Sequence, residues 1–484
     1  MRSLFDANRL NSELSNTFID FEKRIPNLYK VSELYLDTND PTKKFKSEFF
    51  LLRRFFGFLK AFLITLLKSN FNLEPRSKIE GDVLLVSPYI NKTKGNNFFF
   101  GDIQSHFHNL KKTTVDLRIF NGVPPISDYL GEKDNSSLNV LYLPSLSLNE
   151  NILVFKELLK TFKDFSIAIK EEKDPIKKKL LRSIKKRLFS RTNFFNFYLS
   201  AQLDNFIKEN KFKYALVTFD GSPWERIFCK KFKSLNKTGR VAFYQHAPIT
   251  EKSYSLFNKY PKLLNPDHIY CSGKGPHSIF LNKISFLSNI HILGSRKNIQ
   301  DSQKRNFNKE ESVLFITQGS SRDIFILYKI ALRLAFQERK IKVKVLLHPA
   351  VYLGLSFKFL NIALEFFLSN FKCDSVSDEN TFSKSKFMVY FSSSLAIEKM
   401  FYDIRPIHLT NSSNNNPLSI LVDKENPNLS WCTEANDFKD ILNIINSEVN
   451  LDSMVEKYSK QNAKVFSQEY FEPFQITKEF FSDY

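Results

Sequence analysis

Short apolar runs alternate with amphipathic stretches along this chain, and this alternation constrains its fold more than any other feature. In the first half, strand-like runs occupy residues 81–90, 213–220 and 240–246, and a helical stretch over 223–235 separates the last two. The runs contain many β-branched residues and have no polar alternation, as strands buried on both faces of a parallel sheet do. A strand–helix series of this kind predicts a doubly wound α/β sheet.

A second series of the same kind follows a polar segment. Strand-like runs at 313–319, 342–349 and 386–394 alternate with helical stretches at 322–339 and 395–403. Two series predict an α/β protein with two Rossmann-like, doubly wound domains facing a cleft, with added helices. The predicted division is a helical segment at 1–75, a first domain at 76–295 with a helical insertion at 151–210, a linker at 296–311, and a second domain with C-terminal helices at 312–484.

Composition and cysteine content agree with a folded protein in a reducing compartment. The chain has 484 residues, of which 42% are hydrophobic and 25% charged, and these proportions exclude a largely disordered chain. Its four cysteines are scattered without a CxxC pair, which argues against a disulfide framework or a zinc site. The first residues lack an apolar core of signal-peptide length, so we expect a cytoplasmic protein.

The net charge of +20 predicts a polyanionic partner. Residues 170–191 alternate Lys and Arg with Ile and Leu at helical spacing, and residues 46–67 form a second basic, Phe- and Leu-rich stretch. Such helices lie on an anionic membrane surface or pack their apolar stripe on the core, and the sequence leaves both readings open. Nucleic acid is not expected as a partner, because the chain has no zinc-finger, RNP, KH or helix-turn-helix motif.

In the second half, polar residues follow each strand where a parallel sheet binds ligands. A phosphate can bind at helix starts that carry hydroxyl groups, a glycine and an arginine. A ribose or phosphate can hydrogen-bond to an imidazole, and a ribose can also hydrogen-bond to a carboxylate on the first helical turn. An ordinary N-cap turn, an exposed loop histidine and a dipole-stabilised carboxylate are the alternatives. The predicted nucleotide-binding residues are Gln318, Gly319, Ser320, Arg322, His348, Pro349, Ser392, Ser393, Ser394 and Glu398.

Three familiar nucleotide and hydrolase motifs are absent from the sequence. No GxGxxG follows a strand, which argues against NAD or FAD. No GxxxxGK[ST] occurs, which argues against a P-loop NTPase, and no GxSxG occurs, which argues against an α/β-hydrolase.

The strand ends of the first half suggest acid–base chemistry. Asp220 ends one strand, where a carboxylate facing the cleft suits a general base that activates an acceptor hydroxyl. Capping of the helix that begins at Pro223 is the alternative role for Asp220. Glu225, on the first helical turn, and His246, at the end of the next strand, are further catalytic candidates.

These residues resemble a known family. The segments DGSPWE (220–225) and YQHAP (244–248), GSRKN (294–298), and the HP and SSS pairings at 348–349 and 392–394 resemble bacterial surface-carbohydrate glycosyltransferases of the GT-B type. This group contains capsule and O-antigen enzymes and sialyltransferase-like and Kdo-transferase-like proteins. In one place the chain departs from the sialyltransferase pattern, because Phe219 replaces the first of two consecutive acids.

The resemblance implies a metal-independent enzyme without a cofactor, at the inner face of the cell membrane. It would transfer a CMP-activated acidic sugar, such as Kdo or a sialic-acid-like sugar, to a surface polysaccharide or lipid-linked glycan. Asp220 would be the base, and His348 with the serine run would hold the nucleotide. A CDP-glycerol or CDP-ribitol type phosphotransferase and a catalytically silent glycan-assembly protein are the alternatives.

Overall fold

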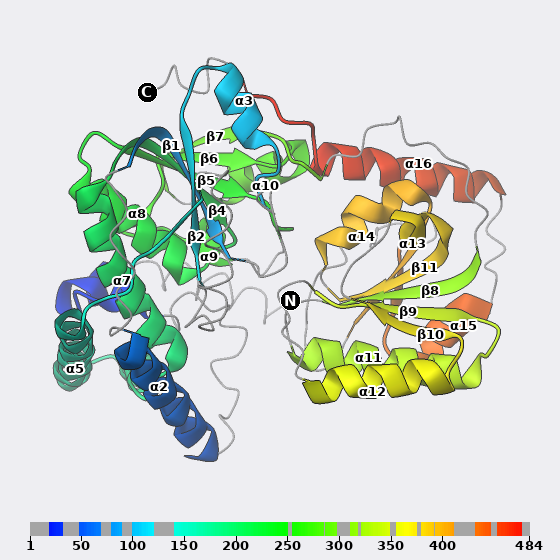
Figure 1. Ribbon diagram of the computed structural model, residues 1–484, viewed down its shortest axis with the longest axis horizontal. Helices are drawn as coiled ribbons and strands as arrows, with labels where there is room; N and C mark the ends of the chain where they lie inside the picture. The colour runs from blue at the N-terminus through cyan, green and yellow to red at the C-terminus, as the bar shows by residue number, and fades with distance from the viewer. Residues whose placement is uncertain are drawn as a thin grey trace.

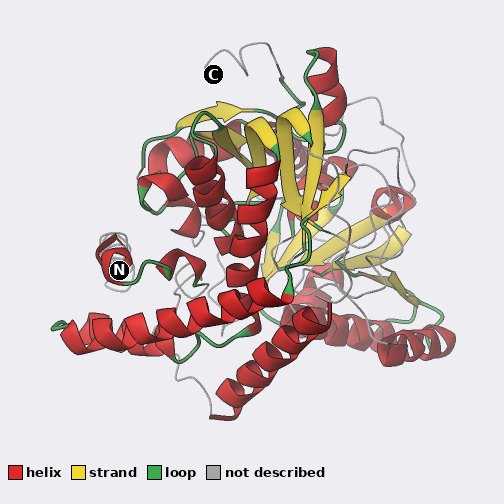
Figure 2. Ribbon diagram, turned by 60° about the vertical axis from the view of Figure 1, so that its left-hand side comes forward, coloured by secondary structure: helices red, strands yellow, loops and turns green. Residues whose placement is uncertain are grey.

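The structure is a computed structural model, and it describes residues 19–31, 48–68, 79–89, 99–120, 140–249, 254–284, 286–297, 310–317, 321–348, 355–374, 379–391, 393–410, 431–446 and 453–476. Within these ranges the chain forms one parallel sheet of seven strands and one of six. Figure 1 shows the two sheets side by side, and Figure 2 shows helices against the strands of both. The predicted architecture of two doubly wound α/β units is confirmed.

The first sheet has the strand order β3-β2-β1-β4-β5-β6-β7, and every neighbouring pair is parallel. Its strands are β1 (Glu80–Pro88), β2 (Thr114–Ile119), β3 (Val140–Tyr142), β4 (Lys211–Phe219), β5 (Arg240–Gln245), β6 (His268–Cys271) and β7 (Asn289–Ile292). The order changes direction between β1 and β4, so the carboxyl ends of these two strands flank a switch point where α/β sheets bind ligands.

Burial on both faces explains the apolar strands of this sheet. Val83, Leu84, Leu85 and Val86 of β1 are all fully buried, and alternate residues belong to different core clusters on opposite faces. The helices of this unit are η1 (Leu28–Lys30), α2 (Glu48–Lys68), α3 (Ile103–Asn109), α5 (Leu148–Glu171), α6 (Pro175–Lys185), α7 (Arg191–Glu209), α8 (Pro223–Leu235), α9 (Tyr254–Phe257), η3 (Lys262–Leu264) and α10 (Lys274–Lys283).

The second sheet repeats the arrangement with the order β10-β9-β8-β11-β12-β13. Its strands are β8 (Glu310–Ile316), β9 (Lys342–Leu346), β10 (Phe371–Asp374), β11 (Ser385–Tyr390), β12 (Arg405–Leu409) and β13 (Thr433–Ala435). The helices are α11 (Ser321–Gln337), α12 (Leu355–Phe367), α13 (Glu379–Lys384), α14 (Ser394–Lys399), η5 (Met400–Tyr402), α15 (Phe438–Asn446) and α16 (Ser453–Tyr470). Here the switch point lies between β8 and β11.

The C-terminal helix α16 joins the two units. It packs against α14 and η5 of the second unit and against α10 of the first, along the upper side of Figure 1. Beyond it, Glu472 accepts a hydrogen bond from the Ser295 amide (2.7 Å) through its carbonyl oxygen, and its own amide donates to the Ser272 carbonyl (2.9 Å). The residues that follow α16 are therefore bound to the edge of the first sheet.

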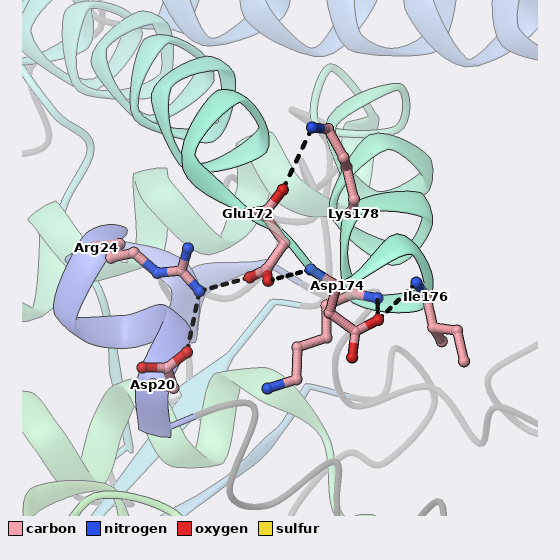
Figure 3. Close-up of polar contacts among 7 residues, drawn as sticks. Asp20, Arg24, Glu172, Asp174, Ile176 and Lys178 are labelled. Atoms are coloured by element: carbon pink, nitrogen blue, oxygen red, sulfur yellow. Dashed lines mark hydrogen bonds and ion pairs between the residues drawn. The ribbon is translucent and has the colours of Figure 1, made fainter.

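Helix α6 carries the basic stretch noted in the sequence, and its orientation is fixed by polar contacts at its start (Figure 3). Asp174 caps the helix by accepting hydrogen bonds from the amides of Ile176 (2.7 Å) and Lys177 (3.2 Å). Glu172 accepts from the Asp174 amide (3.0 Å) and pairs with Arg24 (2.8 Å). Leu181 and Ile184 are buried in the core, whereas Ile176 in the first turn is 74% exposed. The second half of the apolar stripe of α6 thus faces the protein, and Lys179 and Arg182 face water.

Candidate functional site

The turn after β4 presents Asp220 at the switch point of the first sheet. An Asp220 Oδ1 atom accepts a hydrogen bond from the Ser222 amide (3.0 Å), which fixes the turn before α8. Gly221 has φ +86°, and a Cβ there would lie 2.2 Å from the Ser255 hydroxyl. The turn thus requires glycine, and it leaves the Asp220 side chain exposed.

Glu225 lies beneath this turn instead of facing solvent. Its side chain is fully buried and accepts hydrogen bonds from the amides of Asp220 (2.9 Å) and Gly221 (3.0 Å). Burial, together with the charge of Asp220, raises the pKa of Glu225 well above its usual range. The geometry therefore assigns Glu225 to holding the turn in place.

His246 follows β5, the neighbour of β4. Burial lowers the pKa of His246 to about 4, and the positive charge of Lys297 contributes, while the Asp220 carboxylate opposes the shift. Phe99 packs edge-on against the imidazole, with 4.7 Å between ring centroids. Among the described residues, no partner binds the buried Nδ1 atom of His246. A neutral imidazole with an open ring nitrogen therefore lies within electrostatic reach of the candidate base.

Lys297 connects the two units at this point. Its ammonium group donates hydrogen bonds to the His246 carbonyl oxygen (3.2 Å) and to the Ser394 hydroxyl (2.8 Å), and it lies 5.1 Å from the centroid of the Phe471 ring. Burial lowers the pKa of Lys297 to about 8, although the Glu398 carboxylate opposes this shift. The end of β5 in the first sheet and the start of α14 in the second thus share one cation.

The second unit contributes several of the predicted nucleotide-binding residues to the same region. Ser393 caps α14 by accepting a hydrogen bond from the Leu395 amide (3.3 Å). Glu398 pairs with Lys399 (2.8 Å), and its charge also acts on Lys297. Burial lowers the pKa of His348, and the positive charge of Lys297 lowers it further. The structure therefore places His246 and Ser394 in contact with Lys297, and it places His348 and Glu398 within electrostatic range of that lysine. Asp220 lies within electrostatic range of His246.

Some predicted site residues lie outside the described parts of the chain. Only the backbone of Arg322 is described, as the second residue of α11. The residues outside the described ranges are Gln318, Gly319, Ser320, Pro349 and Ser392.

Sequence reasoning did not select Lys297 as a site residue, although it lies in the GSRKN segment. Its partners are 51 and 97 residues away along the chain, so no local spacing connects them. The only local signal is the pair Arg296–Lys297, which begins four residues after the last strand of the first sheet ends at Ile292. In the described ranges, no group of three or more His, Cys, Asp and Glu side chains is arranged to hold a metal ion.

Comparison with known proteins finds similarity at the level of structure. No family model matches the chain, and no curated protein matches its sequence. Similar solved structures include the glycotransferase of kitacinnamycin (10% identity, 82% of this chain and 96% of that chain, TM-score 0.43). Another is UDP-GlcNAc 2-epimerase from Neisseria meningitidis bound to UDP-GlcNAc (12% identity, 81% of this chain and 98% of that chain, TM-score 0.43). A third is Anabaena HepE in complex with UDP and glucose (11% identity, 81% of this chain and 95% of that chain, TM-score 0.43).

Proposed function

We propose that the chain is a glycosyltransferase of the GT-B type, which binds a nucleotide-activated sugar in its second unit and a glycan acceptor in its first. The observation that carries this proposal is the Lys297 bridge. It joins His246, which follows β5 of the first sheet, to Ser394, the first residue of α14 in the second unit. The first is a candidate catalytic residue and the second a candidate nucleotide-binding residue. A cation between the two units can stabilise the negative charge of a leaving phosphate group.

In the proposed reaction, one group of residues acts on the acceptor hydroxyl and another on the leaving phosphate. Asp220 accepts the proton of the acceptor hydroxyl while the hydroxyl oxygen attacks the anomeric carbon of the donor sugar. The bond between that carbon and the phosphate oxygen breaks, and negative charge grows on the phosphate. Lys297, His348 and the Ser394 hydroxyl can donate hydrogen bonds to it. The donor we propose is a CMP-activated acidic sugar, and the acceptor is a surface polysaccharide or lipid-linked glycan at an anionic membrane.

The substitution Asp220→Asn tests the chemistry. Asparagine keeps the size of aspartate and can still accept the Ser222 amide hydrogen bond, but its amide cannot take a proton at neutral pH. We expect transfer to fall by about 10²–10⁴-fold, since a general base contributes that much to rate. Nucleotide affinity, measured by calorimetry, should not change.

A nucleotide panel identifies the donor, and its controls separate the alternatives. Thermal stabilisation by CMP or CDP but not by UDP, GDP or ADP supports the cytidine donor, and a ligand at 100 times its Kd stabilises by about 2.7 kcal/mol. Products formed from CDP-glycerol would instead indicate the phosphotransferase. Near-normal turnover of Asp220→Asn would show that Asp220 is only a helix-capping residue. A protein that no nucleotide stabilises would contradict the proposal that the chain is a glycosyltransferase.

A further inference from the structure

Two helices carry large apolar side chains on the side that faces solvent. In α2, Phe58 and Ala61 pack on the core, yet Phe56, Leu63 and Leu67 on other sides are 58%, 51% and 64% exposed. A surface helix of a globular protein normally has one apolar stripe and one polar face. Helix α2 therefore carries large apolar side chains toward solvent as well as toward the core.

Helix α12 shows the same feature in the second unit. Phe359, Ile362, Phe366 and Phe367 have exposed fractions between 65% and 83%, while Leu368 directly after the helix is fully buried. The four exposed residues are spaced at i, i+3, i+7 and i+8, which places them on one side of the helix. We call Phe56, Leu59, Leu63 and Leu67 of α2, together with Phe359, Ile362, Phe366 and Phe367 of α12, the apolar edge.

The two helices that carry the apolar edge lie on the same side of the protein. Figure 1 shows α2 along the lower margin of the first unit and α12 along the lower margin of the second. None of the described helices is long and apolar enough to cross a membrane. Seating on a planar surface therefore accounts for these exposed side chains, because one plane can contact both helices.

Positive charge borders the apolar edge. Exposed Lys60 lies within the α2 sequence, and α11, which neighbours α12 in Figure 1, presents exposed Lys329 and Arg333 together with exposed Phe325 and Phe336. Aromatic and aliphatic side chains bordered by Lys and Arg are typical of segments that lie in the interface of an anionic bilayer. A second copy of the chain is a poor fit, since it brings its own net charge of +20.

We infer that the apolar edge inserts into the headgroup layer of an anionic phospholipid bilayer, which thereby holds the two units at its surface. In this arrangement the exposed Lys179 and Arg182 of α6 contribute electrostatic attraction. The inference is independent of the reaction proposed above: vesicle binding is measured without donor, and donor hydrolysis is measured without vesicles, so the two can fail separately.

Vesicle sedimentation tests the inference with the full chain. The protein is mixed with vesicles of phosphatidylcholine and phosphatidylglycerol, and in parallel with phosphatidylcholine alone. We expect Phe359→Ser/Phe366→Ser/Phe367→Ser to lower the partition coefficient by about tenfold or more, because each buried Phe favours insertion by a comparable factor. The matched control is Leu281→Ser/Leu287→Ser, at positions that are 58% and 100% exposed outside the apolar edge, and it should bind like the original chain.

Two further measurements keep the inference falsifiable. The charge variant Lys179→Glu/Arg182→Glu on α6 should weaken binding at about 0.1 M salt but not at about 1 M, where charges are screened within about 3 Å. Thermal unfolding of each variant confirms that it folds. Vesicle binding that survives the triple Phe substitution overturns the inference. So does a stable dimer in sedimentation velocity that this substitution converts to monomer, with no vesicle binding by either form.

Discussion

Lys297 is the side chain on which the proposed site depends most. A buried ammonium group is costly unless hydrogen bonds and negative charge compensate for its loss of water. Two hydrogen-bond acceptors and the Glu398 carboxylate supply part of this compensation, yet burial still lowers the pKa of Lys297 to about 8. An anionic ligand would supply the rest, so Lys297 favours the binding of a phosphate group.

Nucleotide affinity should therefore depend on pH above neutrality. Lys297 loses its proton as the pH rises through about 8, and a bound phosphate raises its pKa, so affinity for CMP should fall over this range. Calorimetry at about pH 7 and about pH 9.5 measures the change. Lys297→Met should bind about tenfold or more weakly at neutral pH, with a smaller pH dependence. Equal affinity of both proteins at both pH values would contradict this role.

Unfolding cannot mimic this effect, because its pH dependence has the opposite sign. The pKa of Lys297 is about 8 in the folded protein and 10.5 in its unperturbed state. Between these values the unfolded chain binds more protons, so the contribution of Lys297 to the free energy of unfolding rises with pH. Weaker binding together with equal or greater stability would identify a loss of charge at the site.

His348 and Ser394 give a second prediction at the same site. The His348 amide donates to the Thr317 hydroxyl (3.0 Å), so the backbone stays in place when the imidazole is removed. We expect His348→Ala and Ser394→Ala each to weaken CMP binding by about tenfold, as expected for one lost hydrogen bond to a charged group. His108→Ala, on the exposed side of α3, is the matched control. Unchanged affinity in both site variants would contradict the assignment of His348 and Ser394 to nucleotide binding.

The candidate site could be predicted from the sequence only in part, for a physical reason. Parallel strands place their carboxyl ends on one edge, so Asp220, His246, His348 and Ser394 could be expected to face a common cleft. The roles of Glu225 and Lys297 depend on burial and on partners in other elements. A carboxylate on a first helical turn has the same sequence signature whether it faces solvent or, like Glu225, lies under a turn.

Strands and helices show a similar division between predictable and unpredictable features. The central strands are continuous apolar runs, and the sequence predicts β1, β4, β5, β8 and β11. The short strands β7, β10 and β13, of four, four and three residues, have mixed polar sequences from which no strand is predicted. The sequence predicts the basic helix α6, but the same spacing serves packing on a core and lying on a membrane, so only the structure shows its orientation.

The start of α6 offers a test of what fixes that orientation. Asp174→Ala removes the side chain that accepts the Ile176 and Lys177 amides, and loss of an N-cap costs about 1 kcal/mol. We expect a fall of that size in the free energy of unfolding, measured with urea. Lys173→Ala, at the neighbouring exposed position, is the control and should change little. No loss in Asp174→Ala would show that packing of Leu181 and Ile184 alone holds α6.

The two units are joined by a chain that returns from the second to the first. The segment after α16 lies on the edge of the first sheet, where the Gln475 amide donates to the Leu293 carbonyl (2.8 Å). The adjacent Tyr470 hydroxyl accepts a hydrogen bond from the Ile249 amide (2.8 Å). Phe471 lies beside Lys297, so the same segment borders the cation that bridges the units. Attachment of this segment should therefore affect both the pairing of the units and the site.

Gly294 controls that attachment, and its substitution should release it. The residue has φ +91°, and a Cβ at this position would lie 2.0 Å from the Pro473 carbonyl oxygen, so Gly294→Ala meets both backbone strain and a clash with backbone. Gly57→Ala is the matched control, since no atom lies within 4 Å of a Cβ there and alanine favours the helix by about 1 kcal/mol.

Hydrogen exchange of residues 471–476 should become faster in Gly294→Ala and stay unchanged in Gly57→Ala. Transfer should fall in Gly294→Ala because Lys297 loses its neighbour Phe471. Unchanged exchange with lost transfer would place the effect of Gly294 within the site itself, and unchanged values of both would show that Gly294 does not control the attachment. Faster exchange with unchanged transfer would show that the returning segment does not hold the two units in their active arrangement.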